Sequence, residues 1–364
     1  MLRKWHPPTA ASYWANSEGS EGDEDDVVLW RDDEGTSGPV IGQQLGEGQR
    51  KGLEDLLEQF NDVLQNFPGR TNLAEHAIRT GTAHPVRLPP YRVPHAYRSE
   101  VERQIGEMLQ DGVIEPSTSK WAAPIVLVKK KDGTLHFCVD YQKLNAQSNV
   151  DPYPMPRVDE LVDRLGSARY LTTLDLAKGY WQVPMAEGSR EKTAFITPQG
   201  LFQFTVMPFG LQGAPATFQR MMDHLVASMV AFCVAYLDDL VIFSTSWEEH
   251  LSHIYHVLTA LRDAGLTAKP SKCQFGMDQC VYLGHVVGNG QVRPEVNKVE
   301  ALQRWPVPTT KMQACAFLGL TGYYRKFIRH YATIAAPLTD LTRKFAPNSI
   351  TWSNACDQAF RTCS

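Results

Sequence analysis

Two adjacent aspartates interrupt an apolar segment, and this arrangement constrains the fold more than any other feature of the chain. In AYLDDLVIF, Asp238 and Asp239 separate the apolar run 229–237 from the shorter run 240–243. Two apolar runs around a short polar break are typical of a buried hairpin. Neighbouring like charges at such a turn repel each other unless a cation lies between them. The segment therefore predicts a core hairpin whose turn has a functional role, although a solvated polar turn is the simpler alternative.

A third acid makes the functional interpretation stronger. Asp175 ends a second predicted strand, YLTTLD. If this strand neighbours the hairpin in one sheet, three carboxylates converge, and hard divalent cations prefer such oxygen ligands. Two magnesium ions held in this way can activate a hydroxyl and stabilise a leaving phosphate oxygen. We therefore expect Asp175, Asp238 and Asp239 to be catalytic residues that hold Mg²⁺.

Several classes of protein lose support from what the sequence lacks. The longest uninterrupted apolar run has nine residues, whereas a membrane-spanning helix needs about 20. The basic start MLRKWHPPTA has no apolar segment after it, so no secretory signal is expected. No Walker, GxGxxG or GxSxG motif is present, which argues against P-loop, dinucleotide-dependent and α/β-hydrolase chemistry. The seven cysteines include no CxxC pair and favour reduced thiols in an intracellular setting.

The charge is concentrated at the amino-terminal end. Residues 1–50 carry four basic and ten acidic residues, a net charge of −6, and the other residues carry 32 basic and 30 acidic ones, a net charge of +2. The acidic segment has too little apolar surface to offset its ordering entropy, so we expect a disordered linker. The remaining chain is nearly neutral, and any nucleic-acid partner must be bound by local basic patches.

Helical and strand signals alternate without a strict repeat, which favours the α+β class. Helices are expected over 52–64, from a capping box at Ser99 to Gly112, and after a second capping box at Ser246. Apolar runs at 125–128 and 135–139 flank KKKDGT, which predicts a hairpin with a basic tip. The lysines at that tip are either solvent-exposed charges or contacts for a triphosphate.

Other clusters of potential ligands are weaker candidates for a metal site. His250, His253 and His256 fall away from the apolar stripe of their helix, which indicates a solvated face. Cys273, Cys280 and His285 lack zinc-site spacing and are expected to be buried core residues.

Six segments occur in a fixed order along the chain: VKKKDGTLHFCVDYQKLN (128–145), LTTLDLAKGYWQVPM (171–185), KTAFITPQGLFQFTVMPFGLQGAPATFQ (192–219), AYLDDLVIFS (235–244), KCQFGMDQCVYLGHVV (272–287) and FLGLTGYYRKFI (317–328). Together they resemble the reverse transcriptase of gypsy-type LTR retrotransposons. The resemblance extends over about residues 51–360 and implies a right-hand polymerase with fingers, palm and thumb. It also implies RNA-directed DNA polymerase activity with two Mg²⁺ ions, an RNA template, a DNA or RNA primer and deoxynucleoside triphosphates, without a membrane partner. A cytoplasmic particle is the implied location.

The resemblance assigns a role to individual positions. It makes the three aspartates the magnesium ligands of the palm, in agreement with the argument from the residues alone. Tyr180 would lie under the incoming sugar and exclude a 2′-hydroxyl, and Lys130 would contact the triphosphate. The remaining matches are the wall of the nucleotide pocket, Phe209 and Gly210, and the primer grip, Leu283 and Gly284.

The same resemblance divides the chain into segments. We expect a disordered acidic linker (1–50), an extension leading into the fingers (51–108), the reverse transcriptase domain with fingers and palm (109–287), the thumb and the start of a connection (288–345), and a lead-in to ribonuclease H (346–364). The segment ITWSNACDQAF resembles that lead-in. The chain stops at Ser364, so a ribonuclease H domain is not expected, and no acidic constellation follows Phe360.

Two positions depart from the family pattern. The family has arginine before and after CVDY, where this sequence has His136 and Gln142. A guanidinium makes bidentate contacts to phosphate that a neutral side chain cannot reproduce. The alternative function is therefore a catalytically weakened or inactive nucleic-acid-binding remnant of a Pol polyprotein.

Overall fold

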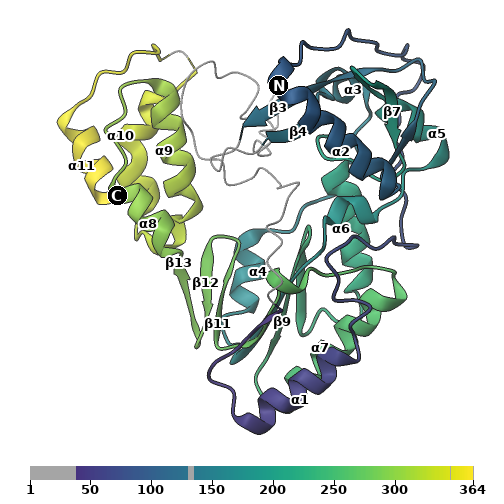
Figure 1. Cartoon of the computed structure of the whole chain (residues 1–364). Coiled ribbons are helices and arrows are strands. Elements are labelled where there is room, and N and C mark those ends of the chain that lie inside the picture. Colours follow the sequence, from purple (N-terminus) through teal and green to yellow (C-terminus); the bar gives the residue numbers. More distant parts are fainter. Residues whose placement is uncertain (1–37, 130–134, 345, 364) are drawn as a thin grey trace. The chain divides into compact units, whose positions relative to one another are not determined.

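The computed structural model describes residues 38–129, 135–344 and 346–363 (Figure 1). No helix in these ranges is long and apolar enough to cross a membrane. The chain divides into two compact units, each made of three stretches of sequence. The first unit comprises Met1–Met155, Thr173–Ile242 and Leu251–Phe275, and the second comprises Pro156–Thr172, Phe243–His250 and Gly276–Ser364.

One sheet of the first unit has five strands and a helix packed against it. Its strand order is β2 (Ile114–Pro116), β7 (Gly200–Phe204), β6 (Phe195–Thr197), β3 (Ala123–Lys129) and β4 (Leu135–Val139). Helix α2 (Arg98–Gln110) places Val101, Ile105 and Met108 in the same buried cluster as Ile125 of β3 and Phe137 of β4. The apolar stripe predicted for this helix is therefore its core face.

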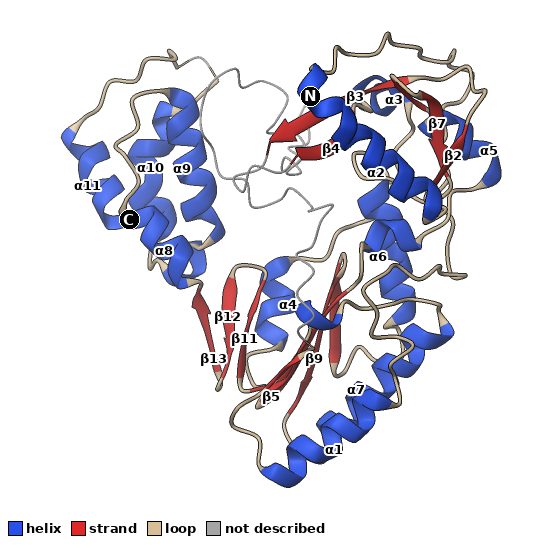
Figure 2. Ribbon diagram, in the orientation of Figure 1, coloured by secondary structure: helices blue, strands red, loops and turns tan. Residues whose placement is uncertain are grey.

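A second five-stranded sheet contains the predicted aspartates. Its order is β1 (Val40–Ile41), β10 (Gln274–Met277), β5 (Tyr170–Asp175), β9 (Asp239–Ser244) and β8 (Cys233–Tyr236). Strands β8 and β9 form the antiparallel hairpin that the sequence predicted. In the chain, helix α6 (Ala214–Leu225) precedes this hairpin and helix α7 (Trp247–Asp263) follows it (Figure 2).

The second unit contains a small sheet and a helical bundle. The sheet is formed by β11 (Gln279–Tyr282), β12 (His285–Gly288) and β13 (Gln291–Pro294). Helices α8 (Val296–Gln303), α9 (Lys311–Tyr323), α10 (Tyr331–Leu341) and α11 (Asn354–Cys363) share a core that includes Phe317 and Phe360. The remaining helices of the chain are short, apart from α1: α1 (Glu47–Glu58), η2 (His95–Tyr97), α3 (Gln142–Gln147), α4 (Val158–Arg164), η3 (Gly179–Gln182), α5 (Glu187–Arg190), η4 (Glu191–Thr193), η5 (Pro270–Lys272) and η6 (Arg325–Phe327).

The basic-tipped hairpin is confirmed in its two strands. Strands β3 and β4 pair antiparallel, with Val128 opposite His136. Its tip at residues 130–134 lies outside the described residues.

The helix termini differ in part from the prediction. Helix α2 begins at Arg98, directly after the turn η2, and Ser99 lies within its first turn, so the predicted capping box does not form. The helix ends before Gly112, as predicted, because that residue has a φ of +63°, which glycine adopts without strain. At α7 the predicted cap is present, since the Glu249 N–H donates to Ser246 Oγ at 3.4 Å.

The prediction of a disordered linker over 1–50 is wrong for its last part. Residues 1–37 lie outside the described residues, but β1 pairs in parallel with β10, and α1 begins at Glu47. Backbone pairing at a sheet edge depends little on charge, and the buried Leu45 and Leu53 supply an apolar face that the overall composition of the segment conceals. The boundary expected at residue 50 therefore falls inside α1.

Candidate active site

The turn of the central hairpin is one residue earlier than the sequence suggested. Tyr236 pairs with Asp239, so Leu237 and Asp238 form the two-residue turn and Asp239 is the first residue of β9. Leu237 has a φ of +53°, a conformation that costs a leucine on the order of 1 kcal/mol. A strained residue at this turn requires support from its surroundings.

A buried glutamine supplies that support. The Leu237 N–H donates to Oε1 of Gln219 at 2.7 Å, and Nε2 of Gln219 donates to the Ala235 carbonyl at 3.2 Å and to Oδ1 of Asp223 at 2.8 Å. Gln219 lies on α6 and has no exposed surface. Its three hydrogen bonds fix the backbone on which Asp238 is carried. The sequence argument missed this residue, and the only signal was a polar side chain on the buried face of an amphipathic helix.

Asp175 lies at the end of β5, the strand next to β9 in the sheet. The Leu176 N–H donates to the Asp238 carbonyl at 3.3 Å, which ties the segment after β5 to the hairpin turn. The ammonium of Lys272 lies 3.6 Å from Oδ2 of Asp175. The three predicted aspartates are therefore neighbours on adjacent strands, with one lysine paired to them.

The electrostatics of these carboxylates favour a bound cation. Burial raises the pKa of Asp238, and burial together with repulsion from Asp238 and Asp175 raises the pKa of Asp239 to about 7. Lys272 opposes both shifts. Among the described residues, no three acidic, histidine or cysteine side chains are already arranged as a metal-ligand cluster. The three carboxylates thus affect one another's charge but do not already form a set of metal ligands. A divalent cation that prefers oxygen ligands would offset the repulsion among them.

Gly179 is a second residue that the sequence argument missed. A Cβ at this position would lie 3.0 Å from Cβ of Asp238 and 3.2 Å from the ring of Phe218. The segment leaving β5 therefore passes so close to the turn that only glycine fits without displacement. This close approach places the next residue, Tyr180, beside the hairpin.

The predicted sugar filter and the predicted pocket wall are in contact. The ring of Tyr180 stacks on Phe209 at a centroid distance of 5.1 Å and lies 5.3 Å from Phe218. Burial and the nearby Asp238 raise the pKa of Tyr180, so its hydroxyl stays protonated. Gly210 has a φ of +87°, and Asn145 holds its loop by donating from Nδ2 to the Gly210 carbonyl at 2.8 Å.

The predicted phosphate contacts are only partly described. Lys130 lies outside the described residues. Gln142 is exposed, and its N–H donates to Oδ1 of Asp140 at 3.0 Å. A cation that the sequence argument overlooked is Lys178, whose Nζ lies 4.7 Å above the ring of Trp181. Trp181 belongs to the buried cluster that includes Phe137 of β4, so this lysine lies beside the sheet that carries the basic hairpin.

Leu283 and Gly284, the predicted primer grip, lie in the second unit. They form the two-residue turn between β11 and β12, because Tyr282 pairs with His285. Both residues have positive φ angles, +47° and +68°. The structure thus assigns a defined turn to these residues within the second unit.

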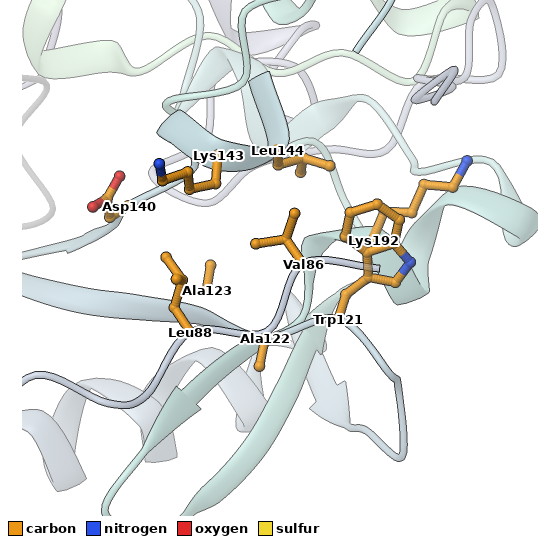
Figure 3. Close-up of a pocket in the computed structure, with 9 residues that line it drawn as sticks. All are labelled: Val86, Leu88, Trp121, Ala122, Ala123, Asp140, Lys143, Leu144 and Lys192. Carbon is orange, nitrogen blue, oxygen red and sulfur yellow. The ribbon is translucent and has the colours of Figure 1, made fainter. Parts of the chain in front are cut away.

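A small pocket in the first unit does not contain the predicted catalytic residues (Figure 3). Its polar side chains are already bonded elsewhere: Lys192 donates to the Ile78 carbonyl at 2.7 Å, and Asp140 accepts from Tyr91 at 3.2 Å. We therefore assign it no ligand. Its lining residues are Val86, Leu88, Trp121, Ala122, Ala123, Asp140, Lys143, Leu144 and Lys192.

The histidines of α7 do not form the solvated face that the sequence predicted. His250 is fully buried, and its two ring nitrogens lie 2.9 Å from the hydroxyls of Thr172 and Ser244. The prediction was wrong because helical periodicity counts histidine as polar, whereas two hydroxyl partners make it a satisfied core residue. His253 stacks on Phe232 with ring centroids 3.8 Å apart, and only His256 is exposed.

Comparisons with known proteins show which family this chain is similar to. Residues 128–287 match the family described as reverse transcriptase (RNA-dependent DNA polymerase). The chain is 42% identical over 301 residues to the retrovirus-related Pol polyprotein from transposon 297 of Drosophila melanogaster, an alignment covering 80% of this chain and 28% of that protein. It is 37% identical over 292 residues to the corresponding polyprotein from transposon gypsy of the same organism, an alignment covering 78% of this chain and 28% of that protein. The chain thus spans less than a third of the length of these relatives.

Solved structures show the same fold. The foamy viral protease-reverse transcriptase dRH in complex with double-stranded DNA matches with a TM-score of 0.80 and 24% identity, over 88% of this chain and 57% of that one. The foamy viral protease-reverse transcriptase in complex with an RNA/DNA hybrid matches with a TM-score of 0.74 and 23% identity, over 88% of this chain and 44% of that one.

Proposed function

Residues 128–287 of this chain belong to the reverse transcriptase family of gypsy-type retrotransposon Pol polyproteins, and from that premise we propose that the protein is an RNA-directed DNA polymerase. The observation that carries the proposal is the position of Asp175, Asp238 and Asp239 on neighbouring strands and their turn, where burial, together with repulsion from the other two carboxylates, raises the pKa of Asp239. Primer extension on an RNA template with Mg²⁺ tests it directly. A chain that binds the primer and template but never extends the primer would contradict it.

The proposed reaction is attack of a primer 3′-hydroxyl on the α-phosphate of a deoxynucleoside triphosphate, with pyrophosphate as the leaving group. Asp175, Asp238 and Asp239 would hold two Mg²⁺ ions, which when bound lower the pKa of the attacking hydroxyl and neutralise charge on the phosphates. Gln219 and Gly179 keep the Asp238 turn in place. The stacked rings of Tyr180 and Phe209 would form the wall of the space that the sugar occupies. Lys272 partly offsets the repulsion among the carboxylates.

The nucleic-acid partners follow from the same premise. The solved relatives are complexes with double-stranded DNA and with an RNA/DNA hybrid, and we propose these two duplexes as the ligands of this chain. In the second unit, Lys326 lies 3.4 Å from Asp163 and Arg325 lies 4.0 Å from Asp159. These exposed pairs are weak, so both cations can exchange their carboxylates for backbone phosphates.

Replacing Asp239 by Asn is expected to stabilise the metal-free protein at pH 8. The folded pKa of about 7 exceeds the ordinary value of 3.8, so between these values the folded state binds more protons than the unfolded state. Stability therefore falls as the pH rises from about 4 to about 7, and the loss persists above it. For this partly exposed carboxyl the loss is on the order of 2 kcal/mol.

Thermal unfolding from pH 5 to pH 8.5, with and without Mg²⁺, measures this effect. Wild-type Tm should rise on acidification, and Mg²⁺ should raise it at pH 8. The Asp239→Asn variant should show a flatter pH profile and a smaller response to Mg²⁺. An unchanged pH slope in the variant would show that another group titrates.

A second candidate function is a nucleic-acid-binding remnant with weakened catalysis. The observation that favours it is the replacement of the family's two arginines by His136 and Gln142. Lys178, whose Nζ lies 4.7 Å above the ring of Trp181, would then be a described cation to compensate for them.

The double variant His136→Arg, Gln142→Arg separates the two functions. A charge-assisted contact contributes about 1.5 to 3 kcal/mol, so two added contacts should lower the apparent KM for the nucleotide by roughly 100-fold if their effects add. Duplex affinity should stay the same. The two constants are measured separately by single-nucleotide extension and by fluorescence anisotropy. A wild-type KM that the double variant does not improve would mean that other cations already bind the triphosphate.

A further inference from the structure

The turn of Leu283 and Gly284 has a backbone that its own sequence does not favour. A two-residue hairpin turn with positive φ at both positions is typical of Asn-Gly or Asp-Gly, because these residues tolerate the left-handed region. Here a leucine occupies the first position with a φ of +47°. Leu283 has no side-chain polar group to stabilise that conformation. The turn therefore depends on contacts from outside the hairpin.

Two consecutive tyrosines at the end of α9 supply these contacts. The hydroxyl of Tyr323 donates to the Leu283 carbonyl at 2.6 Å, and the hydroxyl of Tyr324 donates to the Gly284 carbonyl at 2.9 Å. A Cβ on Gly284 would lie 3.0 Å from the Tyr324 hydroxyl. Both carbonyls of the turn are thus bonded to a single helix end, which fits closely against it.

The imidazole of His285 strengthens the same junction. Its Nδ1 lies 2.8 Å from the Leu283 carbonyl, so this nitrogen carries the proton and donates. The ring centroid lies 5.4 Å from that of Tyr323, 5.4 Å from that of Tyr324 and 5.8 Å from that of Phe327. His285 is buried, and burial lowers its pKa. A neutral ring among three aromatic rings keeps the tyrosines in register with the turn.

We propose that Tyr323 and Tyr324 are positioning residues that hold the Leu283–Gly284 turn in the geometry needed to grip the primer. This inference rests on the proposed function and on the primer-grip role that the family resemblance implies for Leu283 and Gly284. The two hydroxyls act through the turn and make no contact with the nucleotide. Their loss should therefore loosen the primer without affecting nucleotide binding.

The substitutions Tyr323→Phe and Tyr324→Phe test the proposal, because each removes one hydroxyl and keeps the ring. Tyr331→Phe is the matched control. Its hydroxyl lies 2.9 Å from that of Thr321 and donates to the Leu318 carbonyl at 3.4 Å, in the same helical bundle. All variants are measured for thermal stability, for the dissociation rate of a labelled RNA/DNA hybrid without nucleotide, and for the nucleotide KM.

The double variant should release the hybrid about tenfold faster than wild type, because each neutral hydrogen bond accounts for a few-fold in an equilibrium constant. Its nucleotide KM should stay unchanged, and its loss of Tm should resemble that of the control. An equal release rate in the double variant and the control would overturn the proposal, as would an effect confined to the nucleotide KM.

Gly284→Ala distinguishes failure of this inference from failure of the primer-grip assignment. Its Cβ would strain the turn and press on the Tyr324 hydroxyl, so hybrid release should accelerate at least as much as in the double variant. If Gly284→Ala accelerates release and the tyrosine variants do not, the turn grips the primer without the tyrosines, and this inference fails. If none of these variants changes release, the turn does not grip the primer, and the inference fails with that assignment. Primer extension by the wild-type chain tests the proposed function separately.

Discussion

Replacing Asp238 by Asn is expected to lower the rate of nucleotide addition by about three orders of magnitude, because a lost metal ligand removes several kcal/mol of transition-state stabilisation. Asp238 lies in the turn that Gln219 and Gly179 hold against the segment after β5. The amide has nearly the same shape as the carboxylate, so the turn should keep its hydrogen bonds. The fold should therefore survive while the chemistry is lost.

The measurement is single-turnover extension of a primer on an RNA template at saturating nucleotide and Mg²⁺. Asp263→Asn is the matched control, because it removes an acid from an exposed position at the end of α7. The control should extend the primer at the wild-type rate. Polymerisation by the Asp238→Asn variant within tenfold of wild type would remove Asp238 from the proposed metal ligands.

The second large effect is expected at Tyr180. Tyr180→Ala should improve the use of ribonucleotides relative to deoxynucleotides by about 100-fold, since forcing extra atoms against a packed ring costs about 1–3 kcal/mol. The tyrosine stacks on Phe209 and packs near Phe218, so its ring cannot move away from an added 2′-hydroxyl without disturbing both neighbours.

Tyr180→Phe is the control for this prediction, because it removes the hydroxyl and keeps the ring that excludes the sugar oxygen. The ratio of kcat/KM values for the deoxy and ribo forms of one nucleotide should be preserved in the Phe variant and should fall in the Ala variant. Thermal unfolding of both variants reports any loss of packing. An unchanged ratio of these kcat/KM values in Tyr180→Ala would show that Tyr180 contributes only to core packing and does not select the sugar.

The parts of the fold that could be predicted are those determined by local apolar pattern. Strand β5 and the hairpin of β8 and β9 follow continuous apolar runs, and α2 follows a clear stripe. The prediction failed where a neighbour decides the outcome. The edge strand β1 forms because β10 offers backbone partners, and His250 is buried because two hydroxyls from other elements bond it.

The candidate site shows the same division. Asp175 and Asp238 could be named because each ends or interrupts an apolar strand segment, whereas Tyr180 could be named only through the family resemblance. Gln219 and Gly179 could not, because their roles depend on how α6 and the segment after β5 approach the hairpin. Neither a glutamine in a helix nor a glycine after an acid is unusual in a sequence. Only contacts across tens of residues distinguish them from ordinary positions.

The interleaving of the two units limits how this chain can change by recombination. The chain passes between the units five times, after residues 155, 172, 242, 250 and 275. A single genetic crossover therefore cannot exchange one complete unit between related chains, since any breakpoint between the first and last of these passages combines pieces from two parents within at least one unit. Recombinants should survive mainly when the parents share compatible residues on both sides of the breakpoint. Exchange of both units together is the simpler route, and inheritance of these two units as one block is the expected pattern.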